Sequence, residues 1–257
     1  EITTGLQNTF IGGLSGSNIT EANQNVAVGY GTLDADTLGA RSVAVGTNSL
    51  TTQNFTTATN TYNVAAGYFS GANITTGIQN TLIGGLAGDA LTDADYNVAV
   101  GANALSADTL GSNSVAVGAF ALRDQNFTTA TDSHNTAVGY NAGGDVTTGV
   151  DNTLIGGLSG DAITDADFNV AVGNSSLSAN TVGSKNTAIG SSALLLLNPA
   201  TATDTLNTAV GYHAGRGVTT GVKNVLVGGL AGDAFTTGSD NVALGYNALT
   251  ADTLGSR

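Results

Sequence analysis

The chain has 257 residues, a formal net charge of −13, and no Cys, Met or Trp. The absence of Cys excludes a disulfide framework, a thiolate nucleophile and a Cys-ligated metal. Six Lys and Arg residues are too few for a phosphate-binding surface, so we expect no nucleic-acid partner. No apolar run reaches the about 18 residues that a membrane span needs, so we expect no membrane insertion.

One five-residue motif recurs 14 times along the chain, for example as Asn-Val-Ala-Val-Gly at 25–29, 97–101 and 169–173. Its first copies begin at 8, 25, 42, 63 and 80, so the steps between them are 17, 17, 21 and 17. This order then repeats, which gives a longer repeat with a period of 72. The fifth residue of the motif is always glycine, namely Gly12, Gly29, Gly46, Gly67, Gly84, Gly101, Gly118, Gly139, Gly156, Gly173, Gly190, Gly211, Gly228 and Gly245.

The alternation within Val-Ala-Val has a period of two, which is typical of a β-strand with two different faces. The glycine that follows marks a corner, where φ is positive or a Cβ would clash. A unit of this length is too short for a strand–helix–strand crossover, which needs about 30 residues, and it fits one coil of a solenoid. We therefore predict an all-β, parallel β-solenoid of 17- and 21-residue coils, as a single continuous array over residues 1–257.

The two faces of the predicted strand differ in side-chain size. We expect the β-branched residues to face the buried interior and the Ala face to allow close approach of another backbone. Trimerisation is a hypothesis that rests in part on this Ala face.

The first residue of the motif is Asn in 12 copies and Ser in two, at Ser42 and Ser114. Stacked Asn side chains hydrogen-bond along a solenoid axis and satisfy amides that are costly to bury alone. We expect a structural ladder rather than ligand-binding residues, made of Asn8, Asn25, Asn63, Asn80, Asn97, Asn135, Asn152, Asn169, Asn186, Asn207, Asn224 and Asn241.

Every fourth coil is four residues longer, at 50–62, 122–134 and 194–206. The extra residues are expected to bulge outward, because the strand positions stay in phase on both sides of them. Phe55, Phe127 and Pro199 are candidate contact residues for a partner or a neighbouring fibre. The alternative is that these bulges are tolerated surface insertions.

Two sets of carboxylates occupy the same place in successive copies of the longer repeat, and carboxylates spaced by two on a loop can hold Ca²⁺. These calcium candidates lack the order of a calcium loop and a bidentate Glu, so a solvated acidic edge is the alternative; they are Asp89, Asp93 and Asp95, and Asp161, Asp165 and Asp167. An ice-binding face is a further alternative, but it needs Thr on every coil. The Thr-Thr pairs at 3–4, 75–76, 147–148 and 219–220 occur only once in each longer repeat.

Catalytic residues are not apparent in the sequence. The two histidines, His134 and His213, occupy different phases of the repeat, and neither matches a Ser and Asp arrangement. The glycines mark corners and lack the Gly-Lys-Ser/Thr of a phosphate loop. We expect no enzyme activity and no cofactor.

The segment from Ser114 to Leu122, Ser-Val-Ala-Val-Gly-Ala-Phe-Ala-Leu, resembles the head repeat of trimeric autotransporter adhesins, the YadA-like head. The resemblance covers residues 8–249 and implies a left-handed β-roll, three chains per fibre and a role in adhesion or as a surface spacer. The coils here are longer than those of that family, and no neck, stalk or anchor is apparent. Strings such as Asn-Thr-Ala-Val-Gly-Tyr-Asn-Ala-Gly at 135–143 are similar to phage tail-fibre-like proteins.

We therefore expect a structural segment of an extracellular fibre, filament or adhesin, at a cell surface or a virion surface. The alternative is a virion tail-fibre shaft whose receptor-binding tip lies elsewhere. The expected partners are copies of the chain itself, as a homotrimer or an end-to-end filament, and a host or surface receptor. Because no polar capping unit closes either end, the sequence is expected to be a segment of a longer array.

Overall fold

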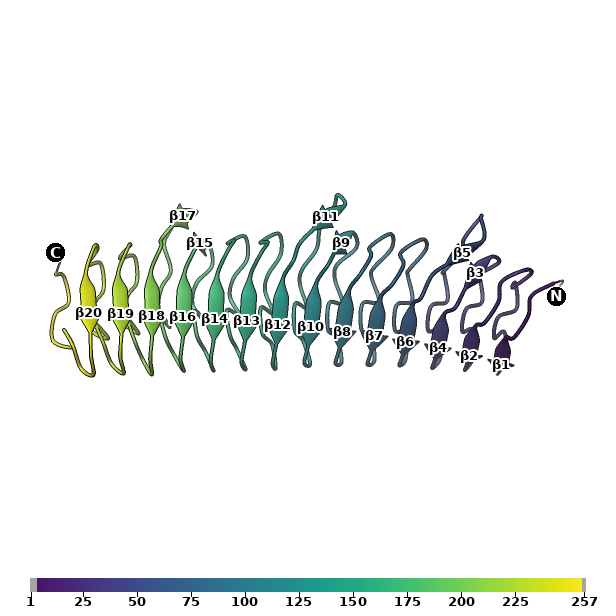
Figure 1. The fold of residues 1–257 in the computed structure, drawn as a ribbon, viewed down its shortest axis with the longest axis horizontal. Helices are drawn as coiled ribbons and strands as arrows, with labels where there is room; N and C mark the ends of the chain where they lie inside the picture. The colour runs from purple at the N-terminus through teal and green to yellow at the C-terminus, as the bar shows by residue number, and fades with distance from the viewer. Residues whose placement is uncertain (1–3, 256–257) are drawn as a thin grey trace. The chain divides into compact units, whose positions relative to one another are not determined.

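The computed structural model describes residues 4–255, which form short strands and turns and no helix. The chain divides into two compact units, Glu1–Ser133 and His134–Arg257, and each is a stack of parallel β-coils (Figure 1). There are about 14 coils in all, so the prediction of an all-β parallel β-solenoid is confirmed. No helix that could cross a membrane occurs within the described range.

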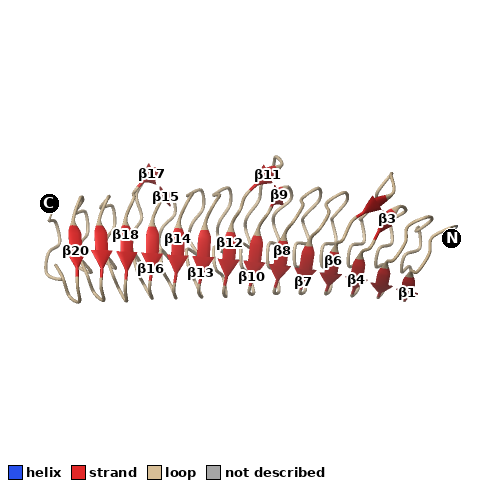
Figure 2. Ribbon diagram, in the orientation of Figure 1, coloured by secondary structure: helices blue, strands red, loops and turns tan. Residues whose placement is uncertain are grey.

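Each coil of the first unit contributes one three-residue strand to a parallel sheet (Figure 2). Successive strands pair in register, so that Ala27 lies beside Ala44 and Leu82 beside Ala99. The strands are β1 (Thr9–Ile11), β2 (Val26–Val28), β4 (Val43–Val45), β6 (Val64–Ala66), β7 (Thr81–Ile83), β8 (Val98–Val100) and β10 (Val115–Val117).

The second unit repeats this arrangement with seven strands of its own. Leu154 pairs with Ala171 across a short step, and Ala188 pairs with Ala209 in the same register across a long one. The strands are β12 (Thr136–Val138), β13 (Thr153–Ile155), β14 (Val170–Val172), β16 (Thr187–Ile189), β18 (Thr208–Val210), β19 (Val225–Val227) and β20 (Val242–Leu244).

The four extra residues of each long coil bulge outward, as expected, and protrude beyond the neighbouring coils (Figure 1). The returning segment of each bulge forms a two-residue parallel strand with the preceding coil. In the first unit, β3 (Gly39–Ala40) pairs with β5 (Thr59–Asn60), and β9 (Gly111–Ser112) pairs with β11 (Thr131–Asp132). In the second unit, β15 (Gly183–Ser184) pairs with β17 (Thr203–Asp204).

The direction in which the strand residues face is the reverse of the prediction. The middle residue of each three-residue strand points into the coil; it is buried from β2 onward, as at Ala27 and Ala99, and half-buried at Phe10 in β1. The flanking residues, such as Val26 and Val28, point outward and are half-buried. The interior of a coil this small has room for Ala at this position in most coils, and the β-branched residues on either side of it in the strand lie on the outside. The Ala column is therefore core and not a surface for another backbone.

Large and small residues compensate one another inside successive coils. In one coil the fourth residue after the corner is Gly88. The side chains of Leu82 and Leu91 occupy the space beside it, since a Cβ at Gly88 would lie 2.8 Å from both. Where the same position is Leu, as at Leu105, the strand contributes Ala99 instead. Large residues thus fill the space that small residues leave in the same or a neighbouring coil, as at Gly71, where a Cβ would meet Leu82 and Leu50; a close-packed interior requires this.

The corner glycines allow adjacent coils to stack closely. All 14 have φ between 122° and 150°, a region that L side chains rarely adopt. A Cβ at Gly84 would overlap the carbonyl oxygen of Gly101 in the next coil, and a Cβ at Gly139 would lie 2.5 Å from that of Gly156. Both sequence-based reasons for an invariant corner glycine are confirmed.

Two neighbouring glycines provide a matched test of this constraint. Gly84→Ala is expected to lower the free energy of unfolding by about 2–4 kcal/mol, because it combines a disallowed φ with a backbone clash. Gly85→Ala is the control, since a Cβ there meets no atom within 4 Å. Thermal unfolding followed by circular dichroism should show a large loss of melting temperature for the first variant only. Equal losses in both variants would contradict the account.

Candidate functional site

The predicted ladder residues lie inside the coils and hydrogen-bond from one coil to the next. The Asn63 Oδ1 atom accepts a hydrogen bond from the backbone N–H of Asn80 at 2.9 Å, and Asn63 Nδ2 donates to the carbonyl of Gly77 at 2.8 Å. Amide-to-amide bonds also occur, as from Asn224 Nδ2 to Asn207 Oδ1 at 3.1 Å. Because these amides are buried and hydrogen-bonded, they connect coils and are not available to a ligand.

The ladder changes at the first long coil, where Ser42 replaces Asn. There the side chain of Gln53, from later in the same coil, takes the place of the missing amide. Gln53 Nε2 donates to Ser42 Oγ at 3.0 Å, and Gln53 Oε1 accepts from Asn63 Nδ2 at 2.9 Å. The Ser42 hydroxyl also pairs with that of Thr61 at 2.5 Å. Ser42 is therefore one part of a buried network that includes the long coil.

A buried carboxylate from the preceding coil completes this network at each of the first two long coils. Asp36 Oδ2 accepts from Gln53 Nε2 at 2.6 Å, and Asp36 Oδ1 accepts from the amide of Gly39 at 3.0 Å. Asp108 makes the same contact with Gln125, also at 2.6 Å. Burial raises the pKa of both carboxyls above the ordinary Asp value, and the hydrogen bonds offset only part of this effect.

The third long coil replaces the network with an uncharged version. Asn180 occupies the place of the carboxylate, Leu197 that of Gln, and Asn186 that of Ser. Asn180 bonds to Gly183, through its Oδ1 to the amide at 2.9 Å and through its Nδ2 to the carbonyl at 2.7 Å. Leu197 has no side-chain N–H to donate, so a carboxylate opposite it would lack a partner. The substitutions are physically linked.

The candidate contact residues of the bulges are not at the surface. Phe55 and Phe127 are each only 6% exposed, and Pro199 is buried as well. The ring of Phe55 packs on Gly39, where a Cβ would lie 2.9 Å from it. These residues therefore anchor the bulges and do not form contact surfaces. The exposed tip of the first bulge consists of the small residues 56–58.

The calcium candidates are held separately by the neighbouring coils. Asp95 Oδ1 accepts from the amide of Ile78 at 2.7 Å, and Asp161 Oδ1 accepts from Ser178 Oγ at 2.6 Å. Asp93 and Asp165 accept from Thr hydroxyls, and Asp167 accepts from a backbone amide. Asp89 Oδ1 has no partner among the described residues. No group of three or more possible metal ligands occurs within residues 4–255.

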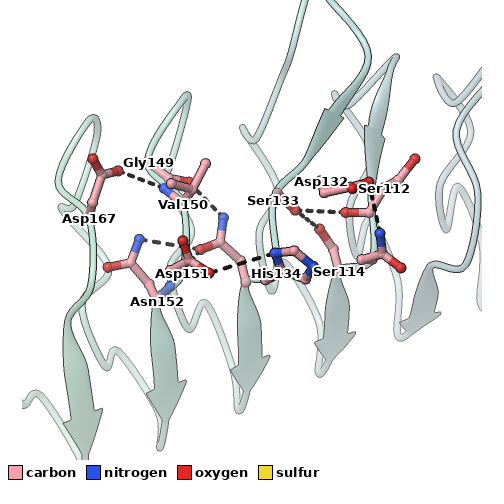
Figure 3. Close-up of polar contacts among 12 residues, drawn as sticks. Ser112, Ser114, Asp132, Ser133, His134, Gly149, Val150, Asp151, Asn152 and Asp167 are labelled. Carbon is pink, nitrogen blue, oxygen red and sulfur yellow. Dashed lines mark hydrogen bonds and ion pairs between the residues drawn. The ribbon is translucent and has the colours of Figure 1, made fainter.

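The histidines are placed at the surface of the second unit. His134 Nδ1 lies 3.6 Å from Asp151 Oδ1 (Figure 3), and His213 stacks on Tyr212 with ring centroids 3.8 Å apart. In the first unit, the Ser133 and Ser114 hydroxyls are paired with each other at 2.5 Å. The contacts of these side chains do not form a Ser–His relay.

The outward strand residues form an uncharged surface on each unit, which we call the outer face. Val45, Ile83 and Ile155 keep 38–42% of their surface exposed. Its first row is Thr9, Val26, Val43, Val64, Thr81, Val98 and Val115 in the first unit and Thr136, Thr153, Val170, Thr187, Thr208, Val225 and Val242 in the second. Its second row is Ile11, Val28, Val45, Ala66, Ile83, Val100 and Val117, and then Val138, Ile155, Val172, Ile189, Val210, Val227 and Leu244.

The sequence contains a signal for this surface, although the prediction places these residues in the interior. The middle strand residue is Ala in ten copies, and an almost uniformly small residue indicates a narrow interior. The flanking positions never carry a charge, although the prediction places them inside the coil because most of them are β-branched. In the structure they form an uncharged exterior.

Comparison with known proteins adds no assignment, because no family model, curated protein or solved structure matches the chain.

The linked residues of the long coil predict a non-additive mutant cycle. Asp36→Asn leaves a single side-chain oxygen to accept from both the Gln53 amide and the Gly39 backbone N–H. Gln53→Leu leaves Asp36 Oδ2 without its donor. Each single change should cost about 1–3 kcal/mol of unfolding free energy. The double variant reproduces the Asn–Leu pair of the third long coil, so it should lose less than the sum by at least about 1 kcal/mol. Urea unfolding of all four proteins measures this; strict additivity would contradict the linkage.

The buried carboxylates also predict a pH dependence with a defined sign. Because their pKa is raised in the folded chain, their contribution to stability is present at low pH and is lost as pH rises through the raised pKa. The melting temperature of the native chain should therefore rise, relative to a variant with Asn–Leu in both long coils, as pH falls from about 7 toward the ordinary Asp pKa. A constant difference between the two proteins would contradict this.

Proposed function

We propose that the chain is a structural segment of an extracellular fibre, filament or adhesin, built by side-by-side association of several copies. The outer face is the observation that supports this proposal. Its rows contain only Val, Ile, Leu, Ala and Thr, although the chain as a whole carries a net charge of −13. Exposed apolar patches of this extent on soluble proteins are typical of association surfaces.

A copy of the same chain is the partner that fits the outer face best. Each coil repeats the same small relief at about 4.8 Å intervals, so a second solenoid can match it over the whole length of a unit. Burial of half-exposed aliphatic side chains stabilises such a contact by about 25 cal/mol for each Å² removed from water. The strands themselves are already paired, so association does not require rearrangement of the sheet.

Three copies around an axis is the arrangement that we propose. Three outer faces directed toward a common axis cover one another and leave the bulges pointing outward. The resemblance of the repeat to trimeric adhesin heads favours three copies over two. In such a fibre, stiffness and length would be the function of this segment, and a cell surface or a virion surface would be its location.

A pair of charged substitutions tests this proposal. Val100→Glu combined with Val117→Glu places two carboxylates in one row of the outer face, where association would bury them unpaired. The native chain should run as three copies in light scattering coupled to gel filtration. The double variant should keep its circular dichroism spectrum and run as a single copy, because a buried unpaired charge weakens an interface by about 3–5 kcal/mol.

The matched control adds the same charge at the bulges. Thr57→Glu combined with Thr129→Glu changes exposed residues and should leave three copies. A native chain that runs as one copy at all concentrations would refute association. A native chain of two copies would keep the outer face as the interface and refute the threefold arrangement.

A further inference from the structure

A second surface, at the corner of the coils, carries a row of tyrosines. Each follows a corner glycine directly and is 57–75% exposed, and they are Tyr30, Tyr68, Tyr140, Tyr212 and Tyr246. We call this position the corner row. The side chains of these tyrosines belong neither to the core nor to the Asn ladder, and the repeat pattern alone assigns no role to them.

The coils without tyrosine carry small, uncharged residues at this position, while two of the tyrosines contact an aromatic ring next in sequence: Tyr68 lies 4.5 Å from Phe69 between ring centroids, and Tyr212 stacks on His213. The other members of the corner row are Gly13, Thr47, Gly85, Ala102, Ala119, Gly157, Asn174, Ser191 and Gly229. The residue after each member is also never Asp, Glu, Lys or Arg. An aromatic row without charge, on a chain with a net charge of −13, suits a neutral ligand better than an anion or a cation.

In the first unit, Tyr30 and Tyr68 are separated by one intervening coil. Two coil steps place them about 10 Å apart along the stack. The Tyr30 ring lies against the backbone of the preceding coil, since a Cβ at Gly13 would lie 3.3 Å from its Cδ2 atom. The ring therefore lies close to the preceding coil on its Cδ2–Cε2 side, while the side chain as a whole stays 57% exposed.

The coil between these tyrosines supplies polar groups. Thr47 is exposed, and the side chain of Asn48 lies across Gly31, where a Cβ would overlap its Oδ1 atom. A hydroxyl and an amide thus lie between two aromatic rings. Precisely placed polar groups among aromatic side chains are what a site needs to orient a ligand that is both flat and rich in hydroxyls.

The second unit contains a similar pair. Tyr212 and Tyr246 are again separated by one coil, which contributes Gly229 at this position. A Cβ at Gly229 would lie 3.4 Å from Cδ2 of Tyr246, so this ring too lies against the preceding coil. Tyr212 is held by stacking on His213. The same spacing therefore recurs on an independent part of the chain.

We propose that the corner row binds an extended chain of neutral sugars. The C–H face of a sugar ring packs on an aromatic ring, and its hydroxyls bond to amides and hydroxyls. In a β-linked chain every second ring presents the same face, at a repeat close to the separation of Tyr30 and Tyr68. Those two residues would hold alternate sugars, with Thr47 and Asn48 bonding the sugar between them. Each member of the corner row lies two residues after the outer face's second row, and the sugar contacts proposed here involve no outer-face residue.

Titration with soluble β-linked oligosaccharides tests this proposal. Cellohexaose and chitohexaose serve as probes, and tyrosine fluorescence reports binding because the chain has no Trp. The native chain should bind at least one probe, and hexamers should bind more tightly than dimers, which span a single tyrosine. Tyr30→Ala and Tyr68→Ala should each weaken binding by about tenfold or more, as truncation of an aromatic anchor does.

Tyr96→Ala is the matched control, because Tyr96 is similarly exposed but precedes a ladder residue instead of following a corner. It should leave both binding and the number of copies unchanged. Absence of binding to both probes, or equal weakening by Tyr96→Ala, would overturn the proposal. A change in the number of copies with Tyr30→Ala would also overturn it, because it would place this ring in a contact between chains.

Discussion

The distance between successive coils at their glycine corners is the constraint on which the rest of the structure depends. The carbonyl of Gly101 lies where a Cβ of Gly84 in the preceding coil would be. This contact allows strands to pair in register around every turn, and it brings each ladder amide within bonding distance of the next coil. Because the perimeter of the coil is short and fixed, the interior is narrow, and the middle strand position must be small or be compensated elsewhere.

That constraint explains why changes in the core are correlated over several residues. A large side chain at Leu82 requires Gly88. Buried polar residues also change together, because each one supplies a hydrogen bond that another needs. Ser42 is tolerated in the ladder because Gln53 supplies the missing amide, and that amide in turn satisfies the carboxylate of Asp36. The third long coil changes all of these polar positions together.

Periodicity revealed the class of fold because a short, regular step with an invariant glycine leaves few other arrangements. Periodicity did not reveal which strand face is inside. That depends on the width of the coil, and an alternation of period two carries no information about width. Leu50 and Lys185 adopt φ of 50° and 62°, as L side chains seldom do, and only the closed path of the coil makes such turns necessary. At the candidate site, the sequence predicts Phe55 as a surface contact, yet its ring packs beneath the bulge on Gly39. Four extra residues that buried no side chain would not keep one conformation.

The closed coil separates two sets of demands along the sequence. Inward positions are fixed by volume and hydrogen bonding to their neighbours, so they can change only in groups. Outward positions face solvent, and yet the outer face excludes charge at every coil, and the corner row carries Tyr at five coils and Gly, Ala, Ser, Thr or Asn at the others. Folding of a single chain does not require uncharged residues at the outer face or at the corner row, because Lys or Glu at these positions would be solvated. A second chain at the outer face and a neutral ligand at the corner row would each impose the composition that is found there.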